Sequence, residues 1–318
     1  MEDKMITVVF PGQGSQRPGM GRDFHDMMKS SRNAYIEASD ALGWDVAALC
    51  FSEDTKLNLT EYVQPCILTT EIAMLRGLEE RYGIKPRYFG GHSLGEYTAM
   101  VAAGVISLAE AVKVTQCRGN LMQKAVPVGI GGMAAVISEK IDIPTLKEYL
   151  SDLPIDIANI NSTNQIVISG KREAIPLAER RLKAAMTENN GFRFVPLNVS
   201  APFHSRFMGS IKESFKNALE TISAKVNPEK AGNVTSNYTG IFHSGNLDDI
   251  IDRMVAQLSG TVQWVKNMHT LAARADEIIE IGPARPLREF FKTIGVACSS
   301  ITTLSAARRV FEPATASD

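Results

Sequence analysis

The segment that most restricts the fold of this 318-residue chain is Gly91-His92-Ser93-Leu94-Gly95, which matches the pattern G-x-S-x-G. A short strand-like segment precedes it at Tyr88-Phe89, and a helical stretch of small residues follows it as far as Ala103. Glycines on both sides of the serine suit a strained turn from strand to helix, because larger side chains would collide there. The pattern predicts an α/β fold in which the Ser93 hydroxyl stands above a sheet; the alternative is a plain glycine-rich turn.

The hydrophobic pattern predicts further strands and helices on both sides of this turn. Ile6–Phe10 is a β-branched run stopped by Pro11-Gly12, which favours a buried first strand. We expect another strand at 277–281 and helices at 23–42, 65–81, 94–103, 108–124, 207–222, 247–258 and 287–294. Pro65 is expected in the first turn of its helix, and the tail after Leu304 is expected to be frayed.

Between residues 127 and 197 the expected order is strand, helix, strand, strand, helix, strand. These elements are 131–137, 143–150, 155–160, 165–169, 171–186 and 192–195. This β-α-β-β-α-β order is that of the ferredoxin-like split βαβ unit. We therefore predict an α/β-hydrolase-like large domain, residues 1–126 and 198–318, interrupted by a ferredoxin-like (βαββαβ) small domain, residues 127–197.

Composition excludes several classes of protein. The 34 Lys and Arg against 35 Asp and Glu give a net charge of −1, which is not the footprint of a nucleic-acid-binding protein. No apolar run reaches the roughly 18 residues that span a bilayer, and the first residues contain no signal-peptide core. The four cysteines form no CxxC pair, which favours reduced thiols and argues against structural zinc. We expect a cytoplasmic protein that binds neither membrane nor nucleic acid.

A serine in such a turn needs a base. The chain has five histidines, which are His25, His92, His204, His243 and His269. The first and the last lie in stretches of helical pattern, the fourth lies in an expected loop, and His92 belongs to the turn itself. His204 lies in the non-helical segment 200–205 just before a helix, where a loop tip can reach a cleft. We therefore favour His204 as the base; the alternative is an ordinary structural histidine.

Arg118 lies among apolar residues of the expected helix 108–124. At about 100° per residue it falls on the face that contains Leu108, Leu121 and Met122. A guanidinium directed inward needs an anion, because an unpaired buried charge is costly. Two explanations are open. The residues alone favour a salt bridge to an internal Asp or Glu; the other is a substrate carboxylate bound by the two-donor fork.

Ten short segments occur in an order that a known family shares. They are Phe10–Gln16, Gln64-Pro65, Gly91–Tyr97, Arg118-Gly119, Gly132–Val136, Asn159–Ser162, Pro202–Ser205, Gln257-Leu258, Val262–Trp264 and Glu280–Pro283. As a set they resemble the malonyl-CoA:acyl-carrier-protein transacylases, and the trans-acting acyltransferases of polyketide assembly lines share the same set. The resemblance covers residues 6–300.

The resemblance implies roles in acyl transfer. Ser93 is implied to be the acylated nucleophile and His204 its general base. The backbone carbonyl of Gln257, rather than a carboxylate, is implied to orient the imidazole. The backbone amides of Gln13 and Leu94 are implied to form the oxyanion hole.

The resemblance also implies which residues bind the substrate. Arg118 is implied to bind the malonyl carboxylate, which reverses the preference for an internal salt bridge. Gln64 is implied to lie near that site, and Asn161 on the facing loop of the inserted domain. In the family, Phe203 beside the base goes with malonyl rather than methylmalonyl preference. Many relatives carry a second glycine within the segment 284–286, where Pro286 should stiffen the turn.

The implied reaction is ping-pong transfer of a malonyl group from malonyl-CoA to the phosphopantetheine thiol of an acyl carrier protein, for fatty-acid synthesis, without metal or other cofactor. One alternative is a trans-acting malonyl acyltransferase of a polyketide synthase, which uses the same residues. A hydrolase that releases acyl groups from carrier proteins is a second, which the charge of Arg118 disfavours for neutral chains. A non-catalytic carrier-binding module is a third, which the intact Ser93 and His204 disfavour.

The implied protein partner is an acidic acyl carrier protein, and the family suggests a monomeric enzyme. Because the net charge is close to zero, basic side chains must be concentrated locally to bind such a partner. The candidates are Lys171, Arg172, Arg180, Arg181 and Lys183 on the inserted domain and Arg206 near the base. An ordinary solvated helix face is the alternative for each of them.

Overall fold

The computed structural model describes residues 4–186 and 191–312, and its first sheet is parallel. The strand order is β2-β1-β7-β8, formed by β1 (Ile6–Phe10), β2 (Tyr88–Gly91), β7 (Glu277–Ile281) and β8 (Ser299–Ile301). Phe10 is in register with Gly91, so the carboxyl ends of β1 and β2 are adjacent. The turn after β1 therefore lies beside the turn that contains Ser93.

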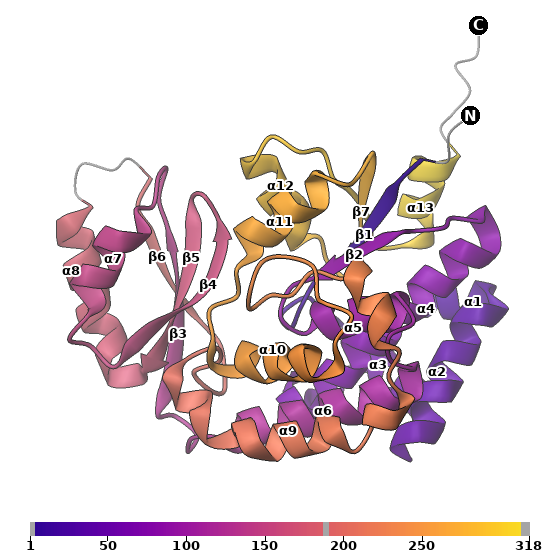
Figure 1. Cartoon of the computed structure of the whole chain (residues 1–318), viewed down its shortest axis with the longest axis horizontal. Helices are drawn as coiled ribbons and strands as arrows, with labels where there is room; N and C mark the ends of the chain where they lie inside the picture. The colour runs from indigo at the N-terminus through magenta and orange to yellow at the C-terminus, as the bar shows by residue number, and fades with distance from the viewer. Residues whose placement is uncertain (1–3, 187–190, 313–318) are drawn as a thin grey trace, which may run out of the picture.

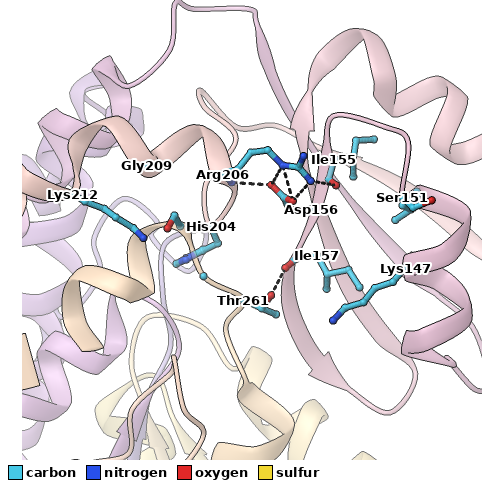
Figure 2. A pocket seen from close by; sticks show the side chains of 13 residues that line it. Lys147, Ser151, Ile155, Asp156, Ile157, His204, Arg206, Gly209, Lys212 and Thr261 are labelled. Carbon is cyan, nitrogen blue, oxygen red and sulfur yellow. Dashed lines mark hydrogen bonds and ion pairs between the residues drawn. The ribbon is translucent and has the colours of Figure 1, made fainter. Parts of the chain in front are cut away.

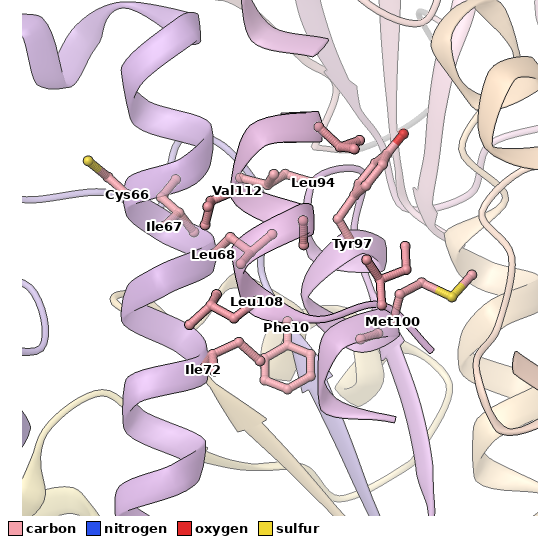
Figure 3. Close-up of a cluster of buried hydrophobic side chains, with 14 of the residues drawn as sticks. Phe10, Cys66, Ile67, Leu68, Ile72, Leu94, Tyr97, Met100, Leu108 and Val112 are labelled. Atoms are coloured by element: carbon pink, nitrogen blue, oxygen red, sulfur yellow. The ribbon is translucent and has the colours of Figure 1, made fainter. Parts of the chain in front are cut away.

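The helices of the N-terminal part lie beside this sheet: α4 and α5 pack on it, and the others pack against α4 (Figure 1). They are α1 (Arg22–Met27), α2 (Lys29–Leu42), α3 (Val46–Phe51), α4 (Thr60–Tyr82), α5 (Gly95–Ala102) and α6 (Leu108–Lys124). Helix α4 is buried along most of its length because its sequence is apolar on nearly every face. Figure 3 shows its side chains meeting those of β1, α5 and α6, with Phe10, Ile72 and Leu108 in one cluster. This core fixes the helices that follow Ser93 and carry Arg118.

The second sheet is antiparallel and confirms the predicted β-α-β-β-α-β order. Its strands are β3 (Gly131–Ile137), β4 (Ile155–Ser162), β5 (Gln165–Lys171) and β6 (Arg193–Leu197), in the order β4-β5-β3-β6. Helices α7 (Ile143–Leu150) and α8 (Ile175–Ala185) cover one face of it (Figure 1). Their apolar faces and the sheet form a core of their own. The fold class is therefore the predicted one, an α/β-hydrolase-like part with a ferredoxin-like part inserted in it.

The C-terminal part returns to the first sheet. Its helices are α9 (Lys212–Glu220), α10 (Leu247–Ser259), α11 (Trp264–Ala272), α12 (Pro286–Thr293) and α13 (Leu304–Phe311). Short 3₁₀ turns of the chain are η1 (Thr55–Asn58), η2 (Arg172–Ala174), η3 (Arg206–Ile211), η4 (Ser223–Lys225) and η5 (Pro228–Asn233). No helix in the described residues is long and apolar enough to cross a membrane.

Strand β4 joins the two parts at the edge of the second sheet. The Ile160 amide donates to the Val262 carbonyl (2.9 Å), and the Val262 amide donates to the Ala158 carbonyl (2.8 Å). The Thr261 hydroxyl adds a bond to the Ile157 carbonyl (2.7 Å). These bonds cover the exposed edge of β4 and hold the inserted part beside the segment that follows α10.

Several predicted boundaries are wrong in the N-terminal part. The helix expected at 23–42 is broken at Met28, which is extended (φ −130°, ψ 132°). Helix α4 begins at Thr60, so Pro65 lies inside it rather than in its first turn. The reason is a tertiary one: the Thr60 amide donates to Gln123 Oε1 (3.0 Å), a side chain from α6.

Boundaries also differ in the later segments. The helix expected at 171–186 begins as the end of β5 and the turn η2, and the one expected at 207–222 begins as the turn η3. The tail after Leu304 is not frayed through Phe311 but forms α13. The Thr303 hydroxyl accepts a bond from the Ala306 amide (3.1 Å), and the Phe311 ring packs against Tyr82. Residues 313–318 of that tail lie outside the described residues.

Candidate active site

The strand-to-helix turn at Ser93 has the strained geometry that the sequence predicts. A Cβ on Gly91 would lie 2.0 Å from the carbonyl oxygen of Gly95, and a Cβ on Gly95 would lie 2.2 Å from that of Phe10. Ser93 itself has φ 53°, and among the described non-glycine residues only His204 (φ 55°) shares a positive value. Such conformations are costly and cluster at functional sites, so the turn is not a plain glycine-rich one.

Ser93 and His204 are in hydrogen-bond contact. Ser93 Oγ lies 2.7 Å from His204 Nε2, and His204 Nδ1 lies 2.8 Å from the backbone carbonyl of Gln257. Because a carbonyl only accepts, Nδ1 carries the proton and Nε2 accepts from the serine hydroxyl. Burial first, and then the positive charge of Arg118, lowers the pKa of His204 to about 3. The imidazole is therefore neutral at ordinary pH, as a general base requires.

Asn237 fixes the turn at both of its ends, and sequence reasoning did not identify it. Its Oδ1 accepts from the Ser93 amide (2.6 Å), and its Nδ2 donates to the Gly91 carbonyl (2.7 Å). The Ser93 amide is thus engaged, whereas the Gln13 and Leu94 amides donate to no acceptor in the described part of the chain. These two amides remain available to a developing oxyanion.

Arg118 is 1% exposed, and its surroundings contradict the salt-bridge explanation. Its NH1 donates to Gln64 Oε1 (2.9 Å), and its NH2 donates to Gln257 Oε1 (2.9 Å) and to Ser93 Oγ (3.2 Å). Among the residues that the structure describes, no carboxylate forms an ion pair with Arg118, and its Nε has no acceptor. Burial accordingly lowers the pKa of Arg118. The site holds a cation beside the nucleophile, and its acceptors are two neutral amides and the Ser93 hydroxyl.

A buried carboxylate lies beneath the site without contacting the base. Glu96 Oε2 accepts from Gln257 Nε2 (2.6 Å) and from the Asn237 amide (3.0 Å). Its Oε1 lies 2.8 Å from His243 Nε2. The signal for Glu96 was its place directly after the turn, whereas nothing local marks Asn237 or His243, which are distant in sequence.

The other predicted residues surround the same centre. Gln64 Nε2 donates weakly to Gln13 Oε1 (3.4 Å), and Phe203 is buried beside His204. Asn161 lies in strand β4 and not on a loop, and its Oδ1 is 2.8 Å from His92 Nε2. The sequence placed it wrongly because β4 runs through Ser162, two residues beyond the expected end.

A cavity of about 630 Å³ leads to His204 between the two parts (Figure 2). Arg206 beside it is not an unpaired cation, since it binds Asp156 of β4 through Nε and NH2. Arg181, a second candidate for partner binding, pairs with Asp152.

Pro286 begins α12, and Glu280 accepts bonds from the next two amides of that helix (both 2.9 Å).

Comparison with known proteins places this chain in a family. Residues 7–287 match the model of the acyl transferase domain. The malonyl CoA-acyl carrier protein transacylase of Bacillus subtilis is 38% identical over 296 residues, which is 91% of this chain and 71% of that protein. The crystal structure of the transacylase from Clostridium perfringens has 33% identity and a TM-score of 0.87, covering 97% of this chain and 96% of that one.

A third relative was solved with a protein partner. It is a malonyl-transacylase in complex with its type II PKS acyl-carrier protein, with 31% identity and a TM-score of 0.88 over 97% of this chain and 99% of that chain. The matched family model and the likeness of both sequence and structure extend over most of the chain. This chain belongs to the family of malonyl CoA-acyl carrier protein transacylases.

Proposed function

We propose that this chain transfers a malonyl group from malonyl-CoA to the phosphopantetheine thiol of an acyl carrier protein through an ester on Ser93. One observation carries the proposal: Ser93 Oγ contacts both a neutral imidazole, at 2.7 Å, and the buried Arg118 guanidinium, at 3.2 Å. A nucleophile and a cation that can bind a carboxylate therefore lie next to each other, within reach of the two ends of one malonyl group. The names of the relatives support the same substrates.

In the first half-reaction, His204 Nε2 takes the Ser93 hydroxyl proton while Oγ attacks the thioester carbonyl carbon. The carbonyl oxygen becomes an oxyanion that accepts bonds from the Gln13 and Leu94 amides. Collapse of this intermediate breaks the carbon–sulfur bond, and the coenzyme A thiolate takes from His204 the proton that came from Ser93. The enzyme is left as a malonyl ester of Ser93.

The second half-reaction repeats these steps with the carrier thiol. His204 takes the thiol proton, and the sulfur attacks the ester carbonyl. The bond to Ser93 Oγ then breaks, and the serine recovers its proton from the imidazole. Neither step consumes an oxidant, a reductant or water.

Arg118 explains the preference for a malonyl group. The malonyl carboxylate is separated from the reacting carbonyl by one methylene, so a cation next to Oγ can bind it while Oγ attacks. The Arg118 Nε has no acceptor within the described residues, and Gln64 and Gln257 already hold the other two nitrogens. A carboxylate that replaces the 3.2 Å contact between NH2 and Ser93 Oγ meets NH2 and Nε as the two parallel donors of a planar fork.

Intact-protein mass spectrometry tests the proposal. After malonyl-CoA, the wild type should gain one malonyl group and lose it to added holo carrier protein faster than to water. Ser93→Ala should gain none, and Arg118→Ala should form malonyl-enzyme at least about 100-fold more slowly, since a buried charge-assisted contact of about 3 kcal/mol is lost. Labelling of Ser93→Ala at the same rate, or release of the acyl group to water alone, would refute the proposal.

We assign the chain to fatty-acid synthesis and keep polyketide loading as the alternative, which the relative solved with a type II PKS carrier supports. Transfer rates to fatty-acid and polyketide carriers, measured in competition, separate the two.

A cytoplasmic location fits the four cysteines, none of which forms a disulfide in the described residues. A monomer fits a site whose serine, base and arginine all come from one chain; sedimentation tests it.

A further inference from the structure

The cavity beside His204 contains two cations that the chemistry at Ser93 does not use. Its inserted-domain wall consists of α7 and β4, and the opposite wall consists of η3, the start of α9 and residues 259–261. His204 lines the cavity on the side of η3 and α9 (Figure 2). Any substrate whose reactive end reaches Ser93 through this cavity must pass between these walls.

Of the basic side chains on these walls, one is neutralised. Arg206 donates to Asp156 Oδ1 (2.9 Å) and Oδ2 (3.0 Å) through Nε, and its backbone amide also donates to Oδ2 (2.8 Å). Asp156 is the one acidic residue among the described residues that line the cavity. Lys147 and Lys212 have no ion pair and donate no side-chain hydrogen bond to any residue in the described ranges.

The two lysines lie on opposite walls. Lys147 belongs to α7 and Lys212 is the first residue of α9. Figure 2 shows both side chains directed into the space between the walls. Two unpaired cations that line one cavity attract an anion that enters it, so this arrangement favours a ligand with concentrated negative charge.

The rest of the lining suits a linear chain with both apolar and amide groups. Leu150, Ile155 and Ile157 supply apolar surface. Ser151, Ser259 and Thr261 supply hydroxyl groups close by. A pantetheine arm has this composition, with a dimethyl carbon and two amides between a thiol at one end and a 4′-phosphate at the other.

We propose that Lys147 and Lys212 bind the 4′-phosphate of the pantetheine arm, and this inference rests on the proposed function. The 4′-phosphate is common to malonyl-CoA and to the modified carrier protein. One phosphate site therefore serves both half-reactions and places the sulfur of either substrate at Ser93. The Arg206–Asp156 pair leaves the phosphate to the two lysines.

Three thioesters that differ only beyond the pantetheine test this assignment: malonyl-CoA, malonyl-phosphopantetheine and malonyl-pantetheine. The variants are Lys147→Ala, Lys212→Ala and the double variant. Lys216→Ala is the matched control, because Lys216 lies on the same helix but pairs with Asp252 and does not line the cavity. Each single variant should raise KM about fivefold for the two phosphorylated thioesters, and the double variant about 20-fold, at unchanged kcat.

For malonyl-pantetheine, which has no phosphate, all variants should match the wild type, and added salt should reduce the differences seen with the other two. An equal loss with all three thioesters, no loss, or a loss with malonyl-CoA alone would overturn the assignment. The last result would place the lysines at the nucleotide phosphates. If the wild type formed no malonyl-enzyme from any of the three, the proposed function would fail instead.

Discussion

At the scale of single residues, Ser93 and His204 have the same left-handed backbone conformation. Neither is glycine, so each conformation costs energy that neighbouring bonds must offset. Asn237 holds the amide of Ser93, and the Gln257 carbonyl holds the imidazole of His204. The reacting atoms are thus positioned before any substrate arrives, which lowers the reorganisation energy that the reaction requires.

The depressed pKa of His204 predicts an unusual pH profile. A base with an ordinary pKa of about 6.5 would lose about 30-fold of its neutral form at pH 5. Because burial and Arg118 lower the pKa of His204 to about 3, the neutral form persists as pH falls from 8 to 5. The rate of malonyl-enzyme formation, measured by rapid chemical quench, should therefore change less than about twofold over this range.

Circular dichroism at each pH checks that the protein stays folded in that experiment. Replacing Arg118 with Met removes a positive charge that lowers the pKa of His204. With acetyl-CoA as the substrate, the fall in rate at acid pH should therefore begin at a higher pH in this variant than in the wild type. A wild-type rate that fell with an apparent pKa near the ordinary histidine value would contradict this account of the base.

At the scale of elements, the end of α10 joins the parts of the site that come from α5 and α6. Gln257 accepts from His204 through its backbone oxygen and from Arg118 through Oε1, and it donates to Glu96 through Nε2. A single residue thus links the base, through its backbone, to the Arg118 guanidinium, through its side chain. Glu96 holds that side chain from below, in a place where water does not reach.

Glu96→Gln should therefore weaken catalysis without touching the reacting groups. The glutamine offers one acceptor oxygen where Glu96 meets Gln257 Nε2, the Asn237 amide and His243, so a buried donor is left unpaired. The free energy of unfolding in urea should fall by about 1–3 kcal/mol. The kcat should fall about tenfold or more through misplacement of Gln257 and Asn237. Glu213→Gln, on the exposed side of α9, is the control and should change neither.

The measurement of kcat is made at a temperature where the Glu96→Gln variant is fully folded, so that loss of stability does not enter. An unchanged kcat with a lowered stability would show that Glu96 acts only in the fold.

The elements that local pattern specifies were predictable, and those that distant side chains specify were not. A β-branched run indicated β1, the glycine spacing indicated the turn at Ser93, and the succession of strand and helix patterns indicated the element order of the inserted part. The start of α4 depends on Gln123, and the end of α13 depends on the contact of Phe311 with Tyr82, so neither boundary could be read locally. The roles of Asn237 and His243 also depend on folding, because they reach Glu96 from 141 and 147 residues away.

At the scale of the whole molecule, the active site lies where the two parts meet. Backbone bonds from β4 to Val262 form one link, and the contact of His92 with Asn161 forms a second. Arg206 and Asp156 form a third, two residues from His204. The position of the inserted part and the position of the base are therefore set by the same contacts.

The Arg206–Asp156 link predicts an asymmetry between its two partners. The side chains are 59% and 25% exposed, so their charge–charge contact should add only about 0.5–1 kcal/mol to stability. Asp156 also accepts the Arg206 backbone amide (2.8 Å), a bond that Arg206→Ala keeps and Asp156→Ala loses. Asp156→Ala should thus lower the free energy of unfolding by about 1 kcal/mol more than Arg206→Ala, and it alone should lower kcat, because it releases the segment that holds His204. Arg181→Ala and Asp152→Ala, an exposed pair within the inserted part, are the controls and should leave kcat unchanged. Equal losses from Arg206→Ala and Asp156→Ala in urea unfolding and in kcat would mean that the charges, not the backbone bond, position the base.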